Sequence, residues 1–442
     1  MRDVLLLAFI LGAAPICLFR PYIGVLLWFW ITLMSPRGYV YGVATEFPLA
    51  VIIAVPTLIG TFLTSTNRRW LPKQLGLILV FWAWTVVTYL HCRQVPILAA
   101  HQTEGWNQLL EFSKMLLMSM VAVLLVTSKE RLRYLMLLTA FCLGVLALKG
   151  AIWGVLTGGA YRVYGPHRSF LSDNNDFALA LNMTMAISFF LAKIETSRKL
   201  RIALWVLFGS SIICVVLSYS RGGLAALAVV LLVLTIKSRH KLIGALLAAI
   251  VVFGFLTVSP EGWQSRMSDI FVHGQLDDSA EERLVVWEYS WNVAQAFPIT
   301  GGGFECFTPE LFAQYETRPL PSNTYTALGP HSIYFQVLAE HGFVGLFLFL
   351  TLLLSCLWSL YRLGRASKIY PEVSWMKPYC DMLLVGFLAY LVGGAFLGRA
   401  YFDVIYEFVA CVLILKILYR RAMMSDVQES PVIQVEEAYS IA

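Results

Sequence analysis

Charged residues are scarce in this chain of 442 residues: Asp, Glu, Lys and Arg make up 14%, against about 25% in soluble domains. Hydrophobic residues make up 59%, and the mean hydropathy is +0.71. The length alone would suggest about three soluble domains, but the chain lacks the polar residues to cover their surfaces. The composition excludes a disordered chain, a fibrous protein and a nucleic-acid binder. It predicts an all-α polytopic membrane protein.

Motifs for metals and nucleotides are also missing. The eight cysteines are scattered and no CxxC pair occurs, which argues against a metal knuckle and a disulfide scaffold. The sequence contains no Walker loop, HExxH, GxSxG or DxD motif. We therefore expect no cofactor, no metal ion and no cytosolic nucleotide donor.

Apolar runs of about 20 residues can cross a bilayer as helices, and they predict most of the fold. Two shorter runs, 4–19 and 22–34, flank Arg20 and Pro21 and form either two thin helices or a broken hairpin. The total is 12 or 13 crossings, and the sequence favours 12 with both ends of the chain inside. The other runs lie at 48–64, 74–90, 107–127, 134–156, 177–192, 202–218, 222–236, 242–258, 333–359, 380–398 and 402–419.

Basic residues predict the orientation, because cytoplasmic loops are enriched in Lys and Arg. Every second connection is basic, and these connections carry 20 of the 33 Lys and Arg residues. We expect them on the cytoplasmic side. The predicted organisation is membrane helices over 1–258, an external loop over 259–333, membrane helices over 334–421 and a disordered cytoplasmic tail over 422–442.

The external connection 259–333 is 75 residues long, far beyond the usual 2–8 residues between bundled helices. Its stretch SAEERLVVWEYSWNVAQAF has Trp287 and Trp291 at helical spacing. Ser279 is a candidate cap at its start, and Pro298 closes it. The loop is either a surface domain resting on the bilayer or a lid over a reaction site.

The basic residues of the external connections are all arginines, whereas the internal connections mix Lys and Arg. Arginine suits bidentate contact with phosphate. Arg221 stands out because it lies in SYSRGG at the outer edge of the bilayer, where a charge is costly and marks a candidate site. The alternatives are salt bridges to the ten acidic residues of the long loop and, for Arg221, snorkelling to the interface.

A histidine begins the membrane span that follows the long loop. His331 lies in GPHSIYFQVLAEHGFVG, and the positive end of that helix favours a neutral imidazole and attracts an anion. Both effects suit a general base beside a phosphate. Tyr334 lies one turn further along the same face and is a candidate substrate-binding residue. The alternative for His331 is a simple cap or interface residue.

A polar patch, RVYGPHRSFLSDNNDFALAL, precedes another span. Such a cluster suits a hydroxyl-rich ligand such as a sugar. It is equally typical of a well-capped helix start, because Asp and Asn are good capping residues. The candidate ligand-binding residues in it are Arg162, His167, Arg168, Asn174 and Asn175.

Three of these segments resemble the O-antigen ligase and O-antigen polymerase superfamily: SYSRGG, the long loop with its Arg283 helix ending in PITGGGF, and HSIYFQVLAEHGFVG. The N-terminal region and YGPHRSFLSDNNDFALALNM resemble its branch of exosortase-associated O-glycosylation ligases. The resemblance implies a GT-C-type glycosyltransferase of the bacterial inner membrane, with about 12 transmembrane helices and one large periplasmic helical loop. It implies that His331, Arg221 and Arg283 are the catalytic residues.

The resemblance also implies the reaction. The family moves a glycan from undecaprenyl pyrophosphate to an acceptor on the periplasmic side without a metal. The expected partners are this donor, lipid A-core oligosaccharide as acceptor and membrane lipid. His331 would remove the acceptor proton while Arg221 and Arg283 hold the pyrophosphate, and the anomeric carbon would invert.

Three alternatives stay open. A polymerase would use a second lipid-linked glycan as acceptor, and a protein O-glycosylation ligase would use a Ser or Thr hydroxyl. A lipid-glycan flippase or exporter is the non-enzymatic alternative, which would place charges along a midplane path.

Overall fold

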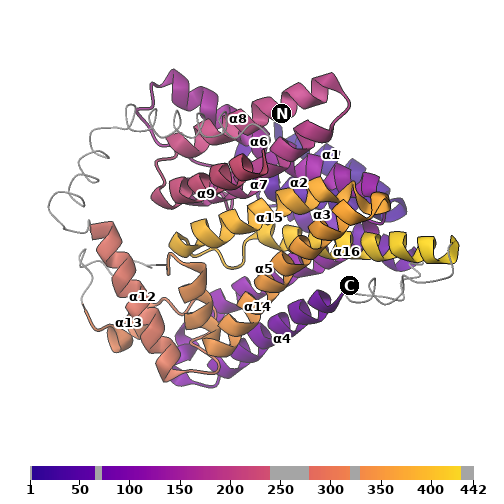
Figure 1. The fold of residues 1–442 in the computed structure, drawn as a ribbon. Helices are drawn as coiled ribbons and strands as arrows, with labels where there is room; N and C mark the ends of the chain where they lie inside the picture. Colours follow the sequence, from indigo (N-terminus) through magenta and orange to yellow (C-terminus); the bar gives the residue numbers. More distant parts are fainter. Residues whose placement is uncertain (1, 65–71, 239–277, 319–328, 430–442) are drawn as a thin grey trace.

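The computed structural model describes residues 2–64, 72–238, 278–318 and 329–429, and these ranges contain helices and no strand (Figure 1). Eight of the described helices are long and apolar enough to cross a membrane. The protein is therefore an all-α polytopic membrane protein, as predicted. The helices are α1 Arg2–Phe19, α2 Pro21–Met34, α3 Leu49–Leu63, α4 Lys73–Cys92, α5 Gln102–Leu125, α6 Lys129–Leu156, α7 Asn174–Ile194, α8 Arg198–Leu217, α9 Arg221–Lys237, α12 Asp278–Ala296, α13 Pro309–Tyr315, α14 Ile333–Ile369, α15 Met376–Gly393 and α16 Asp403–Glu429.

The predicted spans correspond to helices wherever the structure describes them, and the span at 242–258 lies outside the described residues. The predicted disordered tail from residue 422 is wrong for its first part, because α16 continues to Glu429. The sequence RRAMMSDVQE contains several good helix formers although it is not apolar, so hydropathy alone missed this extension. Residues 430–442 lie outside the described residues.

The basic connections meet at one end of the bundle, called here the basic end. Arg133, at the start of α6, donates through Nε to Glu195 Oε1 after α7 (2.6 Å). Lys237, at the end of α9, donates to Asp381 Oδ1 in α15 (2.5 Å). Arg421 of α16 donates to a backbone carbonyl before α6. The grouping of basic connections predicted from the sequence is thus present in space.

Residues 2–34 form two helices that pack against each other and against α3. Pro21 breaks the chain between them and occupies the first turn of α2, where its missing N–H costs nothing. Tyr22 Oη donates to Arg131 O (2.9 Å), so this break lies at the basic end. Asp3 lies beside Gly42 in the α2–α3 connection, so the chain begins at the opposite end. Of the two arrangements that the sequence leaves open for this region, the structure has two separate helices, and the total of 12 or 13 crossings stays a prediction.

Helix α7 is the centre of the bundle. It packs against α6, α8, α9 and α15, and 89% of its apolar window is buried. Its side chains are small or apolar on nearly every side, so neighbouring helices approach closely. The first turn of α7 therefore has a fixed place at the end opposite the basic one, which is called here the site end.

Helix α14 bends at Gly342, whose φ of 68° is open to glycine but strained for other residues. The segment that follows α12 packs into this bend. Gly302 N donates to Ala339 O (2.7 Å), Gly303 N donates to Glu340 O (2.9 Å) and Phe343 N donates to Pro298 O (2.9 Å). These bonds satisfy backbone groups that the bend leaves without helical partners. They also attach α12 firmly to the span that begins after His331.

The predicted helix of the long loop is present as α12, which lies with α13 at one end of the molecule (Figure 1). It begins at Asp278, so Ser279 lies within the helix and not in the expected capping position before it. Trp287 stacks on Phe335 of α14 with ring centroids 5.2 Å apart. Helix α12 therefore rests on the first turn of α14.

Candidate active site

Segments distant in sequence converge at the site end. The start of α9 packs against the short helix η6, Gly394–Phe396. The approach is so close that a Cβ added to Gly222 would lie 3.0 Å from Phe396 Cβ. The loop after η6 packs in the same way against the residues before α14, since a Cβ added to Gly398 would lie 2.9 Å from Pro330 Cγ. Trp287 of α12 donates to Pro330 O (3.0 Å). The segments that carry Arg221, His331 and Arg283 are thereby linked into one assembly.

The turn before Arg221 is held by polar side chains of α7. Asn174 Nδ2 donates to Ser218 O (2.9 Å), and Asn182 Nδ2 donates to Gly223 O (2.8 Å). Ser220 caps α9 by accepting a bond from Gly223 N (3.0 Å). The glycines after Arg221 thus allow α7 and η6 to approach closely. Arg221 itself is half-buried at the first position of α9.

His331 lies just before α14 and is half-buried. Burial lowers the pKa of this imidazole, and the positive charge of Arg283 lowers the pKa further. The carboxylates of Asp173 and Glu282 act in the opposite direction. The balance favours a neutral imidazole, which is the form that can accept a proton.

The backbone at the site end is strained. His331 has a φ of 44°, and Tyr219, two residues before Arg221, has a φ of 53°. Arg168 and Glu305 have φ values of 56° and 58°. Non-glycine residues adopt this left-handed conformation rarely, and such strain is concentrated at functional sites. Its presence beside both His331 and Arg221 supports a functional role for this end of the bundle.

An ion pair that sequence reasoning missed lies at the same end. Arg399, in the loop after η6, donates through Nε to Asp176 Oδ1 (2.8 Å) and through a second nitrogen to the other carboxylate oxygen. The pair joins that loop to the first turn of α7. Burial raises the pKa of the nearby Glu305, while the charge of Arg399 opposes that rise. The one available signal was an arginine at the edge of a predicted span.

Glu340 of α14 is buried and contacts two segments that flank this helix. Its carboxylate accepts a bond from Tyr401 Oη (2.6 Å) and another from Glu305 N (3.2 Å). Its role is to join α14 to the segments on either side of it.

The residues predicted to bind substrate separate into two groups. Asn174 is buried and bonded to Ser218 O, Asn175 bonds Asp173 Oδ1 through its backbone N–H (2.8 Å), and Tyr334 Oη donates to Leu391 O (2.8 Å). These three residues use polar groups in packing and capping. Arg162, His167 and Arg168 are exposed.

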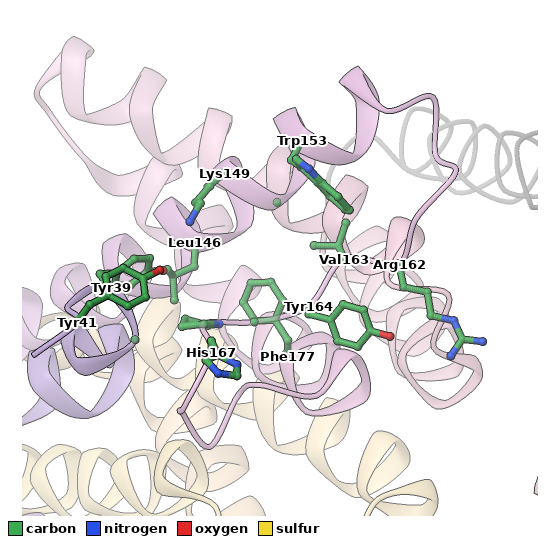
Figure 2. Close-up of a pocket in the computed structure, with 14 residues that line it drawn as sticks. Tyr39, Tyr41, Leu146, Lys149, Trp153, Arg162, Val163, Tyr164, His167 and Phe177 are labelled. Carbon is green, nitrogen blue, oxygen red and sulfur yellow. The ribbon is translucent and has the colours of Figure 1, made fainter. Parts of the chain in front are cut away.

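Arg162 and His167 line a pocket of about 390 Å³ between α6 and the connections 36–41 and 161–167 (Figure 2). The lining of this pocket includes none of His331, Arg221 and Arg283. The structure therefore divides the predicted residues between the assembly at the site end and a second, neighbouring pocket. In the described ranges, no group of three or more His, Cys, Asp and Glu residues is arranged to hold a metal ion.

Fold and site together define a multi-pass membrane protein in which segments carrying arginines and a histidine of lowered pKa meet at one end of a helical bundle. The family model for O-antigen ligase matches residues 206–350, which include Arg221, Arg283 and His331. A model for a family of unknown function (DUF5935) matches residues 1–180. No curated protein matches the chain. The match over residues 206–350 supports membership of the O-antigen ligase superfamily, whose activity is of the ligase or polymerase type.

Proposed function

We propose that the protein is an O-antigen ligase. It transfers a glycan from undecaprenyl pyrophosphate to lipid A-core oligosaccharide at the periplasmic face of the bacterial inner membrane. The observation that carries the proposal is that Arg283 is near enough to His331 for its charge to lower the pKa of the histidine. A base held neutral beside a phosphate-binding cation is what this transfer requires.

The reaction begins with the donor, which diffuses sideways from the bilayer. Arg221 and Arg283 hold its pyrophosphate through charge-assisted hydrogen bonds. His331 takes the proton of the acceptor hydroxyl, and that oxygen forms a bond to the anomeric carbon. The bond from this carbon to the phosphate oxygen breaks on the opposite face, and its electron pair leaves with undecaprenyl pyrophosphate. The anomeric configuration is inverted, and the arginines stabilise the charge that develops on the leaving group.

The arginines can neutralise the leaving diphosphate in the way that a metal ion does in other transferases. We therefore expect transfer by the purified protein to continue in EDTA and to need neither ATP nor a nucleotide sugar. The measurement is transfer of labelled glycan with and without chelator. A loss of activity that Mg²⁺ restores would contradict the arginine-based mechanism.

The pH dependence provides a test with a definite sign. His331 must be neutral to act, so the rate falls as the pH falls through the pKa of His331, which is lowered from 6.5. Arg283→Gln removes a positive charge that lowers this pKa, so the acid limb of the pH–rate profile should move to higher pH.

Glu282→Gln is the matched variant, since it removes a negative charge that raises the pKa of His331. Its acid limb should move to lower pH. Profiles of kcat/KM against pH for the two variants should therefore shift in opposite directions from the wild type. A shared direction, or no shift in either, would show that another group is the base.

The function itself is tested in cells that lack the protein. A ligase predicts lipid A-core without long glycan chains, together with accumulation of lipid-linked polymer. A polymerase predicts single repeat units on lipid A-core. Loss of glycan from a protein with intact lipopolysaccharide would identify a protein O-glycosylation ligase, and loss of periplasmic lipid-linked glycan would identify a transporter.

A further inference from the structure

The pocket that Arg162 and His167 share is lined by aromatic rings and cations. The rings are those of Tyr39, Tyr41, Trp153, Tyr164 and Phe177, and the basic side chains are those of Lys149, Arg162 and His167. No carboxylate lines the pocket. Figure 2 shows Lys149 pointing from α6 toward Tyr39, while Arg162 lies at the rim. A ligand here would meet flat apolar surfaces and positive charge at the same time.

Lys149 needs an explanation that packing does not give. It lies seven residues before the end of α6, which places it about 10 Å inside a membrane-spanning helix. Its Nζ lies 4.9 Å from the centroid of the Tyr39 ring. Within the part of the chain that the structure describes, no carboxylate pairs with Lys149, Arg162 or His167. An ionisable residue at such a depth usually faces a binding site or a polar path.

The segments that form the walls of this pocket pack closely against one another. A Cβ on Gly38 would lie 2.3 Å from His167 O, and a Cβ on Gly165 would lie 1.9 Å from Leu171 O. A Cβ on Gly150 would lie 2.7 Å from Val163 Cγ1. These contacts fix the two connections against each other and against α6. The pocket is thus part of the packed structure.

The same chain segment joins the pocket to the catalytic assembly. Val163 N donates to Leu217 O (3.0 Å), and Tyr219 Oη donates to Gly159 O (2.6 Å). Asp173, whose charge acts on His331, lies six residues after His167. Six residues span no more than about 22 Å, so a short oligosaccharide held in the pocket could extend to His331.

We propose that this pocket binds a phosphate-bearing sugar of the acceptor, with the sugar ring against the aromatic wall and the phosphate on Lys149 and His167. This inference rests on the proposed function and deepens it, because it assigns the acceptor to the anionic glycolipids. Lysine binds phosphate as a point charge, and aromatic walls with a few charged groups are typical of ligand pockets.

The test uses the full-length protein in lipid nanodiscs, with deacylated core oligosaccharide as acceptor. The acceptor is used as isolated, with its phosphates, and after phosphatase treatment. Lys149→Gln should raise the KM for the phosphorylated acceptor roughly tenfold, the cost of one partly solvated charge-assisted contact. It should leave kcat and the KM for the donor unchanged. The dephosphorylated acceptor should already have the higher KM, and Lys149→Gln should not raise that KM further.

Lys114→Gln is the matched control, because Lys114 also lies in a membrane-spanning helix but pairs with Glu111. It should leave both KM values unchanged. An equal rise of both KM values in Lys149→Gln would assign Lys149 a structural role and overturn the proposal. An effect that appears only in discs of anionic phospholipid, whatever the acceptor, would assign the pocket to a membrane lipid and overturn it equally.

Direct binding of the two oligosaccharides, measured without donor, separates this proposal from the proposed function. Wild-type protein that binds the phosphorylated oligosaccharide about tenfold more tightly than Lys149→Gln, yet transfers no glycan to it, would refute the ligase function and leave the pocket assignment standing. Equal binding by both proteins would refute the pocket assignment, whatever the outcome of transfer.

Discussion

His331→Ala should lower glycan transfer by about a hundred- to ten-thousand-fold, the range that general bases contribute, while donor binding stays largely intact. The reason is the division of roles at the site end. Burial and the charge of Arg283 lower the pKa of His331, so its proposed contribution is to accept a proton and not to bind the pyrophosphate. The measurements are single-turnover transfer rates and donor affinity for the same purified variant.

His91→Ala serves as the control, since His91 lies in the last turn of α4, outside the three segments that carry Arg221, Arg283 and His331. Its transfer rate should stay near that of the wild type. If His331→Ala loses donor binding to the same extent as turnover, the histidine is an anchoring residue. The base would then have to be another group of the assembly.

The membrane helices could be predicted because each one is specified by its own stretch of sequence. An apolar run of about 20 residues specifies a spanning helix whatever surrounds it. The α1–α2 break was less certain because 4–19 and 22–34 are each short for a full span. In the structure α1 ends at Phe19 and α2 begins at Pro21, and the contact of Tyr22 with Arg131, made between distant parts of the chain, places the break at the basic end.

The catalytic candidates could be proposed because Arg221 and His331 stand at helix starts beside unusual local sequences. The Arg399–Asp176 pair could not be predicted, because its partners are 223 positions apart and either residue reads as an ordinary surface charge. Polar side chains that are used internally were misjudged for the same reason. From the sequence, Asn174 and Tyr334 could bind a substrate, but in the structure both donate hydrogen bonds to backbone carbonyls.

The neighbouring pocket could likewise be predicted only in part, because its lining residues come from separate parts of the chain. Its cations come from α6 and from the connection that follows, and two of its rings come from the connection after α2. The sequence marked His167 and Arg162 as candidates for sugar binding but offered no reason to join them with Lys149 or Tyr39. The joining depends on the close approach of Gly38 to His167, which only the packed structure specifies.

Arg221→Lys and Arg283→Lys should each lower the rate of transfer by roughly 10- to 150-fold. Lysine keeps the positive charge but loses the planar fork that binds two phosphate oxygens at once. The loss of one charge-assisted contact to a desolvated phosphate costs about 1.5–3 kcal/mol, which gives that range if the contact strengthens in the transition state. The measurement is transfer with purified donor and acceptor, after each variant has been checked for folding.

Arg318→Lys is the matched control because Arg318 is an exposed arginine that pairs with Glu288 of α12 through Nη2 (2.6 Å). Exposed ion pairs contribute little to stability, so this variant should stay near the wild-type rate. A role as simple point charges would leave Arg221→Lys and Arg283→Lys near that rate as well. In that case both arginines would serve the architecture of the site end, and Arg399, whose guanidinium lies beside the same segments, would become the next candidate for holding the pyrophosphate.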